Sequence, residues 1–173
     1  MKKQQAKKNN LATAPSSAAA AKEVVCLQNN KDHFFVPRHC LQISRMLSSA
    51  VTGHVGDPFI RITLDRIDGP TLELICEYLT LRDGKESAAI EAPIRSNCLA
   101  DFLVEADEAK FIDTVDQCSR HLLYNLTRAA DYLDIPCLLD LCCAKIASLI
   151  KGKPRSQLAQ ILDPGKQQGT HVP

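Results

Sequence analysis

The sequence has no tryptophan, and its 173 residues include only five phenylalanines and three tyrosines. A core made from it must therefore be mainly aliphatic, rich in leucine, isoleucine and valine. It also lacks any run of about 18 apolar residues, so no membrane-spanning helix is expected. The alanine run at 18–21 is too short for the apolar part of a secretory leader, so no leader is expected either. The hydrophobic (45%) and charged (24%) fractions are ordinary for a globular protein, and the length suits one compact domain with a tail or two.

The sequence also lacks the short motifs that most often mark catalytic sites. It has no G-x-S-x-G, no G-x-x-x-x-G-K-[ST] and no G-x-G-x-x-G, and its five histidines form neither H-x-x-x-H nor H-E-x-x-H. His39 and Cys40 are adjacent, but consecutive residues of a helix do not face each other, so a nucleophile–base pair is not expected there. Nothing in these patterns argues for an enzyme, and we predict a protein that is not an enzyme and that needs no cofactor.

Acidic residues are missing from the first ten positions, where all the charged side chains are lysines (Lys2, Lys3, Lys7 and Lys8). The whole chain has a net charge of +1, so without these four lysines 17 basic residues face 20 acidic ones. A slightly acidic body is a poor match for a phosphate backbone, and direct binding of nucleic acid is not expected. Residues 1–22 are low in complexity and show no apolar pattern, which predicts a disordered basic arm.

The eight cysteines lack the spacing of a zinc site. There is no C-x-x-C pair, and Cys142 and Cys143 are adjacent, which does not fit the usual ligand spacing. Cys26, Cys76 and Cys137 stand among aliphatic residues, where a free cysteine acts as a small hydrophobic side chain. We therefore predict reduced structural thiols, with neither a disulfide nor a metal site.

The first half of the chain alternates predicted strands and helices. The segments 23–28 and 33–36 flank the turn-like NNKD and predict a β-hairpin. A helix is predicted to begin at Pro37, with apolar residues at roughly helical spacing: Cys40, Leu41, Ile43, Met46 and Leu47. The alternating segment 59–64 predicts a half-buried strand. Asp68, Gly69 and Pro70 begin a further helix, which is expected to end at Arg82, Asp83 and Gly84.

The second half is predicted to be mainly helical. Residues 82–98 are expected to form an exposed loop, followed by helices at 102–112 and 119–135, of which the latter has the clearest apolar periodicity. Asp134 is a candidate cap for another helix, and a last short helix is expected near 158–162. Strands that precede a run of helices predict an α+β fold, with a small sheet and helices packed against it.

The C-terminal helices carry more apolar side chains than one narrow stripe needs. These are Leu122, Leu123, Leu126, Leu138, Leu139, Leu141, Ile146, Leu149, Ile150, Leu158, Ile161 and Leu162. They can pack on the sheet and on one another, or they can leave one side open as a groove for a partner's helix. The pattern alone does not decide between the two. An open groove would also cause some weak self-association of the isolated chain.

Two motifs resemble the S-phase-kinase-associated (Skp) adaptor family of SCF ubiquitin ligases. They are AADYLDI (129–135) and LLDLCCAKIASLIKGK (138–153). The segment VVCLQNNKDHFFV (24–36) is similar to the hairpin at the start of that family, and ISRML and ICEYLTLR are similar to its first two helices. The resemblance covers about residues 23–162. Its N-terminal part also suits elongin C, a relative with the same BTB/POZ fold. Elongin C stops near the YLD motif, however, so the continuation through LLD and IKGK favours the Skp type.

The resemblance implies a division of the chain. It assigns 1–22 to the arm and 164–173 to a flexible tail. Between them, 23–135 is assigned to a BTB/POZ domain that binds a cullin. The segment 136–163 is assigned to a Skp-type helical extension that binds F-box substrate receptors. The implied function is that of an adaptor in a cullin-RING ubiquitin ligase, in the cytoplasm and nucleus. The BTB/POZ domain is expected to fold after removal of the extension. An elongin C-like adaptor and a structural BTB/POZ protein outside ubiquitin transfer remain as alternatives.

The resemblance also implies which residues bind each partner. Asp131 and Tyr132 are expected to contact the cullin, although the family has asparagine in place of Asp131. The expected F-box contacts are Leu123, Leu126, Ile135, Leu138, Leu141, Cys142, Lys145, Ile146, Leu149, Ile150, Leu158 and Ile161. Two further departures are a small insertion near 112–121 and the lack of the family's acidic, tryptophan-containing last helix.

Overall fold

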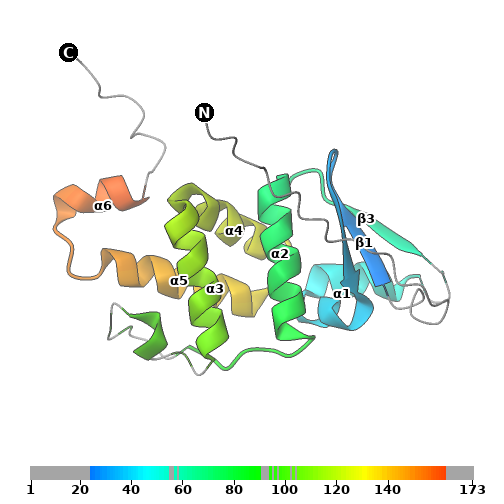
Figure 1. Cartoon of the computed structure of the whole chain (residues 1–173), viewed down its shortest axis with the longest axis horizontal. Coiled ribbons are helices and arrows are strands. Elements are labelled where there is room, and N and C mark those ends of the chain that lie inside the picture. Colours follow the sequence, from blue (N-terminus) through cyan, green and yellow to red (C-terminus); the bar gives the residue numbers. More distant parts are fainter. Residues whose placement is uncertain are drawn as a thin grey trace, which may run out of the picture.

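The computed structural model describes residues 24–162, except for 55–56, 58, 91–93, 95, 97, 102 and 104. The predicted basic arm (1–22) and flexible tail (164–173) lie outside the described residues. The described part has the predicted α+β fold, in which a small mixed sheet lies at one end and helices form the rest (Figure 1). Helix α6 lies at the end opposite to the sheet (Figure 1).

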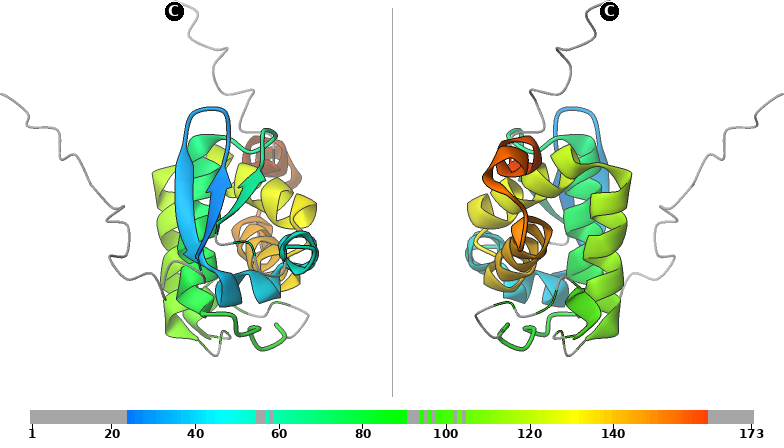
Figure 2. Two further views of the ribbon diagram at one scale, coloured as in Figure 1. Left: turned by 90° about the vertical axis from the view of Figure 1, so that its right-hand side faces the viewer. Right: turned by 90° about the vertical axis from the view of Figure 1, so that its left-hand side faces the viewer.

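The sheet has three strands in the order β2-β1-β3. Strands β1 (Val24–Gln28) and β2 (His33–Pro37) form the predicted antiparallel hairpin, and β3 (Ile60–Thr63) pairs with β1 in parallel. In the hairpin turn the side chain of Asn29 accepts two backbone N–H groups, at 2.9 and 2.7 Å, which is why asparagine suits this position. A parallel partner requires a crossover connection, which the chain between β2 and β3 supplies. Figure 2 (left) shows the three strands turned toward the viewer.

The single helix predicted after the hairpin is in fact two helical segments. Arg38–Ile43 forms a 3₁₀ helix (η2), and Arg45–Thr52 forms α1. Ser44 separates them because its backbone is extended (φ −105°, ψ 116°) and its side chain caps α1. The Ser44 hydroxyl accepts the N–H of Leu47 at 3.1 Å and donates to the carbonyl oxygen of Leu133. The capping serine thus interrupts the helix, although apolar residues on both sides of it enter one core.

Helix α2 (Gly69–Arg82) begins and ends where the sequence predicts. Asp68 caps it by accepting the N–H of Thr71 at 2.9 Å. The helix ends at Asp83, whose left-handed conformation (φ 49°) is one that aspartate tolerates. α2 packs against β2 and η2 on one side and against α4 on the other. Its fully buried side chains are Leu72, Ile75, Tyr78 and Leu79.

The remaining helices follow the predicted order along the chain. A short 3₁₀ helix, η3 (Leu99–Asp101), precedes α3 (Ala106–Cys118), α4 (Arg120–Tyr132), α5 (Pro136–Ile150) and α6 (Arg155–Leu162). Helix α3 begins and ends several residues later than predicted. No helix among the described residues is both long enough and apolar enough to cross a membrane.

Asp134 does not cap α5, contrary to the prediction. It has a left-handed backbone (φ 50°), and the N-cap position belongs to Ile135, which makes no side-chain cap. Pro136 instead supplies a first helical residue that needs no partner for an N–H group. Asp134 faces α1, because its carbonyl oxygen accepts the N–H of Arg45 at 3.0 Å and its carboxylate lies 3.6 Å from the Arg45 guanidinium.

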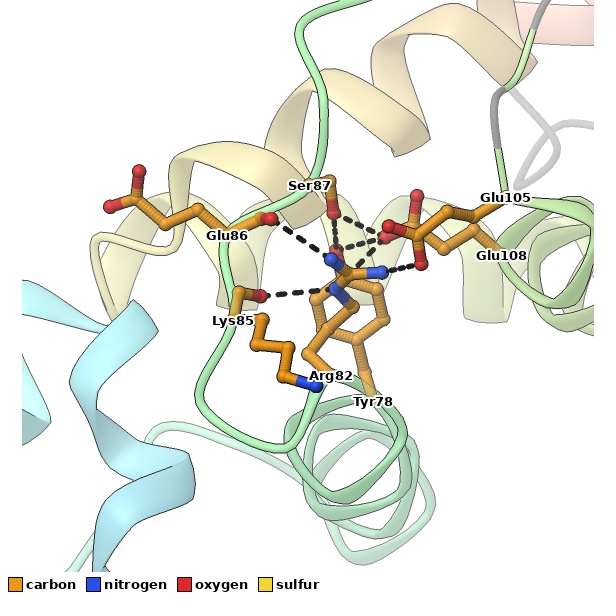
Figure 3. A network of polar contacts seen from close by, with 7 residues as sticks. All are labelled: Tyr78, Arg82, Lys85, Glu86, Ser87, Glu105 and Glu108. Carbon is orange, nitrogen blue, oxygen red and sulfur yellow. Dashed lines mark hydrogen bonds and ion pairs between the residues drawn. The ribbon is translucent and has the colours of Figure 1, made fainter.

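The loop after α2 was predicted to be exposed over 82–98, but its beginning is anchored by a buried arginine. The Arg82 side chain is only 5% exposed. Its guanidinium donates to the carbonyl oxygens of Lys85 (3.1 Å) and Glu86 (2.9 Å), as Figure 3 shows. These bonds hold the first turn of the loop against the end of α2.

The same guanidinium pairs with two carboxylates at the start of α3, Glu105 and, at 3.5 Å, Glu108 (Figure 3). The hydroxyl groups of Tyr78 (2.9 Å) and Ser87 donate to Glu108. Burial alone would lower the pKa of Arg82, but the hydrogen bond to Glu105 and the charge of Glu108 outweigh it and raise that pKa. We call these five residues the Arg82 cluster. It joins α2, the following loop and α3.

One hydrophobic core runs through the described residues, and α5 belongs to it. Leu138, Leu141 and Cys142 of α5 are buried in the same cluster as residues of α2, α3 and α4. The segments 23–135 and 136–163 therefore do not have separate cores. The expectation that the first folds after removal of the second stays a prediction, and the cut would expose the apolar side chains that α5 covers.

Candidate partner-binding faces

Helix α5 has a second apolar face, which is only partly buried; Leu139 and Ile146 on it touch the edge of the core. Leu139, Cys143, Ile146 and Ile150 recur at i, i+4, i+7 and i+11, so they lie on one side of the helix. Cys143 is exposed and the other three are half-buried. We call these four residues the outer stripe. A helix that is apolar on two sides buries one in its own core and leaves the other for a partner.

Helix α6 extends this apolar surface. The chain turns after α5 at Gly152, whose left-handed backbone (φ 71°) suits glycine, and α6 turns back and packs against α5 (Figure 1). The Tyr124 hydroxyl of α4 donates to the carbonyl oxygen of Ile161, which ties α6 to α4. Leu158 and Ile161 are half-buried, and Leu162 is 49% exposed. Helix α6 lies at the end of the molecule that is turned to the viewer in Figure 2 (right), and we call the outer stripe and the apolar residues of α6 together the apolar surface.

The predicted F-box contacts divide into two groups in this structure. Six are fully buried and pack inside the core of the chain alone, so their side chains are not exposed for contact in this structure: Leu123, Leu126, Ile135, Leu138, Leu141 and Cys142. Five others are half-buried and remain candidates for contact: Ile146, Leu149, Ile150, Leu158 and Ile161. The sequence pattern placed all of them on apolar faces but did not say which face points inward.

Lys145, the twelfth predicted contact, is directed toward α3. Its ammonium group lies 2.8 Å from Asp113 and 3.4 Å from Asp116, and the side chain is only 12% exposed. Arg120 also pairs with Asp116, at 3.2 Å. Lys145 therefore joins α5 to α3 in this structure, and its contact with a partner stays a prediction.

Leu139, Cys143 and Leu162 were not among the predicted contacts, although they lie on the same surface. The first two share the face of Ile146 and Ile150 by simple helical spacing, so the periodicity of α5 contains the signal. This signal is hard to read because α5 is apolar on both faces. A pattern that assumes one apolar stripe then selects residues from both faces.

The residues assigned to the cullin lie on a different surface, at the end of α4. Tyr132 is 41% exposed, so it is not a core residue, and Asp131 is exposed beside it. The Arg66 guanidinium lies 6.0 Å from the centre of the Tyr132 ring, a cation–π arrangement. Arg66, Arg128 and Tyr132 line a shallow pocket between α4 and the start of α2. We call Arg66, Arg128, Asp131 and Tyr132 the Tyr132 face.

Comparison with protein families finds one match. The model of the Skp1 family, dimerisation domain, matches residues 136–163, which include α5 and α6. In the structure this range carries the outer stripe on one side and core residues on the other.

Three relatives have similar sequences. "S-phase kinase-associated protein 1 homolog" of Tetrahymena thermophila is 36% identical over 97 residues, which span 56% of each chain. "SKP1-like protein 20" of Oryza sativa subsp. japonica is 36% identical over 106 residues, covering 56% of this chain and 58% of the relative. "E3 ubiquitin ligase complex SCF subunit sconC" of Emericella nidulans is 27% identical over 137 residues, 79% of this chain and 81% of the relative. In two of the three, the similarity thus spans little more than half of the relative's length.

Proposed function

We propose that this chain is an adaptor of an SCF-type cullin-RING ubiquitin ligase, of the Skp1 family whose model matches residues 136–163 and whose members the chain resembles in sequence. In this role it bridges a cullin and an F-box substrate receptor for protein ubiquitination. The printed name of the Emericella nidulans relative, an SCF subunit, supports the assignment to this kind of complex. The observation that carries the proposal is the pair of separate surfaces, one apolar and one polar, on a single core.

The apolar surface is the proposed F-box site. The outer stripe and the half-buried residues of α6 present aliphatic side chains in two helical rows, and an amphipathic helix from a partner can lay its apolar face between such rows. Burial of this surface stabilises the complex by roughly 25 cal/mol per Å² in gross terms, most of which is offset by ordering and association costs. Residues such as Leu138 and Leu141 support the surface from below, because they hold α5 in the core.

The Tyr132 face is the proposed cullin site. Tyrosine is enriched at the energetically dominant positions of interfaces, because its ring is apolar and its hydroxyl is polar. Arg66 beside the ring and Asp131 next to it supply charges that a partner can match. Asp131 stands where the resembling family has asparagine, so the charge presented to the cullin differs by one unit at this point.

We infer a binding role rather than catalysis, in keeping with the proposed place of the chain as a subunit of an SCF-type complex. The assignment to the cytoplasm and nucleus is part of the same proposal, and it rests on the resemblance to the adaptor family. The alternatives are an elongin C-like adaptor and a structural protein outside ubiquitin transfer.

A binding experiment with two surface variants tests the proposal. The full chain is titrated with a purified cullin N-terminal domain and with an F-box peptide. Ile150→Asp should weaken binding of the F-box by tenfold or more, since it puts a charge into an apolar contact, about 1.4 kcal/mol or more. Tyr132→Ala should weaken binding of the cullin by roughly 1–3 kcal/mol. Each variant should leave the other partner's affinity unchanged.

Leu81→Asp is the matched control, because Leu81 is 40% exposed on α2 and belongs to neither surface. It should bind both partners with normal affinity. Binding of elongin B in place of an F-box peptide would select the elongin-type alternative. A wild-type chain that binds no cullin would select the structural alternative, and loss of both partners in one variant would contradict two separate surfaces.

A further inference from the structure

Three side chains with metal-binding atoms meet at the end of α2, two of them adjacent in the sequence and the third distant from both. His39 and Cys40 belong to η2, and Asp83 follows α2. The His39 Nε2 atom lies 2.6 Å from the Asp83 carboxylate and 3.5 Å from the Cys40 sulfur. One donor atom from each residue lies within 4.8 Å of the other two. We call them the His39 cluster.

The closeness of His39 and Cys40 differs from the sequence-based expectation. Consecutive helical side chains leave the backbone in different directions, which led to the prediction that these two do not meet. The imidazole of His39 nevertheless reaches across to both the Cys40 sulfur and the Asp83 carboxylate. The expectation of no metal site rested on ligand spacing within one segment, and spacing cannot reveal ligands that two distant elements supply.

The backbone holds the cluster in place from both sides. The N–H of Asp83 bonds to the carbonyl oxygens of Leu79 and Thr80, both at 3.2 Å, which fixes its left-handed conformation. Gly84 also has a positive φ (76°), and a Cβ atom there would lie 2.6 Å from the carbonyl oxygen of His39. The loop therefore packs directly on the backbone of η2, and only glycine permits this approach.

We propose that His39, Cys40 and Asp83 bind a zinc ion, with water as the fourth ligand. In a tetrahedral zinc site the Zn–S bond is about 2.3 Å long and the Zn–N bond about 2.0 Å. The sulfur and nitrogen ligands then lie about 3.5 Å apart. The Cys40–His39 distance already has this value. The Asp83 carboxylate must withdraw from His39 by several tenths of an ångström, which an exposed side chain does easily.

The donor set selects the metal. Thiolate and imidazole together favour zinc, or cobalt as its spectroscopic substitute, over magnesium and calcium, which take oxygen ligands. Cys40 is buried (1% exposed) while His39 and Asp83 are largely exposed, so the ion would lie at the surface with sulfur beneath it. Binding would release the thiol proton of Cys40, and His39 would bind through a deprotonated Nε2 with its remaining proton on Nδ1. The bound ion would join η2 to the end of α2.

Titration with cobalt tests the proposal on the full chain, reduced and freed of metal. One Co²⁺ per chain is expected, with the visible bands of tetrahedral cobalt and the near-ultraviolet thiolate-to-cobalt band, both displaced by Zn²⁺. Zinc at a hundredfold excess over its Kd should also raise the Tm by roughly 5–10 °C. His39→Gln, Cys40→Ala and Asp83→Asn should each weaken cobalt binding by about tenfold or more, since loss of an outer-shell contact alone has such an effect. Asparagine keeps the left-handed backbone at position 83.

Two variants control for other donors of the same kind. His54 lies 2.9 Å from Asp57 and forms a histidine–aspartate pair outside the His39 cluster. Cys143 is an exposed thiol that also lies outside the cluster. His54→Gln and Cys143→Ser should therefore bind cobalt as the wild type does. Absence of the thiolate band in the wild type overturns the proposal. So does a band that survives Cys40→Ala or disappears in Cys143→Ser, because it would then belong to other cysteines.

Discussion

Removal of the Arg82 guanidinium should destabilise the chain more than any comparable change at its surface. Arg82→Met keeps most of the side chain's apolar length but leaves Glu108, only 6% exposed, without its positive partner. Breaking a buried ion pair by removing one member typically costs about 3–5 kcal/mol, because the remaining charge stays buried and uncompensated. The two carbonyl oxygens of the loop also lose their donors. A loss of roughly 4 kcal/mol would lower the Tm by about 8–16 °C in a chain of this size.

Chemical denaturation of three variants checks this reasoning. Lys110→Met is the matched control, because Lys110 and Asp107 form an ion pair on the surface of α3, 76% and 73% exposed. Its expected effect is within about 0.5 kcal/mol. Adding Glu108→Gln to Arg82→Met should recover part of the loss, because the buried charge is removed. The reasoning is refuted if Arg82→Met costs no more than Lys110→Met, since water would then screen the Arg82 cluster as it screens the surface.

Further predictions concern single positions with a defined structural role. Ser44→Ala should cost about 1–3 kcal/mol in denaturant unfolding, because it removes the cap of α1 and leaves a buried carbonyl oxygen without its donor; a neutral result would show that water replaces the hydroxyl. Gly84→Ala should destabilise the chain by more than about 1 kcal/mol. Gly53 has open space around it and φ −70°, so Gly53→Ala should be nearly neutral. Equal Tm values for the two variants would contradict the close approach of Gly84 to the His39 carbonyl oxygen. Burial raises the pKa of both Cys76 and Cys142 to about 12, so these thiols stay protonated at pH 8. They should react with iodoacetamide more slowly than the exposed cysteines, and peptide mass spectrometry measures the difference.

Local signals in the sequence predicted much of the fold. Asn29 in the hairpin turn and Asp68 before α2 act through side-chain bonds to nearby backbone N–H groups, and such bonds depend only on neighbouring residues. The helix break at Ser44 and the contacts of Asp134 were not predicted, and both involve residues that are distant in the sequence. Ser44 bonds to the carbonyl oxygen of Leu133, and Asp134 faces Arg45. A serine can lie inside a helix or cap the start of a new one, and the residue type alone does not distinguish the two cases. Tertiary contacts decide between them.

The same limit applies to the candidate sites. The periodicity of α5 predicted apolar faces, but it did not say that Leu138 and Leu141 are fully buried while Leu139 and Ile150 stay partly exposed. That orientation depends on where α3 and α4 pack. Exposure of Tyr132 was predicted from its motif, while its neighbour Arg66 comes from the loop after β3 and could not be placed beside it from the sequence.

The two-sided packing of α5 links the occupancy of its surface to the lifetime of the chain. A ligand that binds the folded form but not the unfolded form raises the free energy of unfolding by RT ln(1 + [L]/Kd), about 2.7 kcal/mol at a hundredfold excess. Helix α5 is part of the only core among the described residues. The added free energy of unfolding therefore stabilises all of the described residues and not α5 alone. Molecules without a partner would then unfold more often and be degraded first. The abundance of the protein in a cell would follow the supply of its partners, without any dedicated regulator.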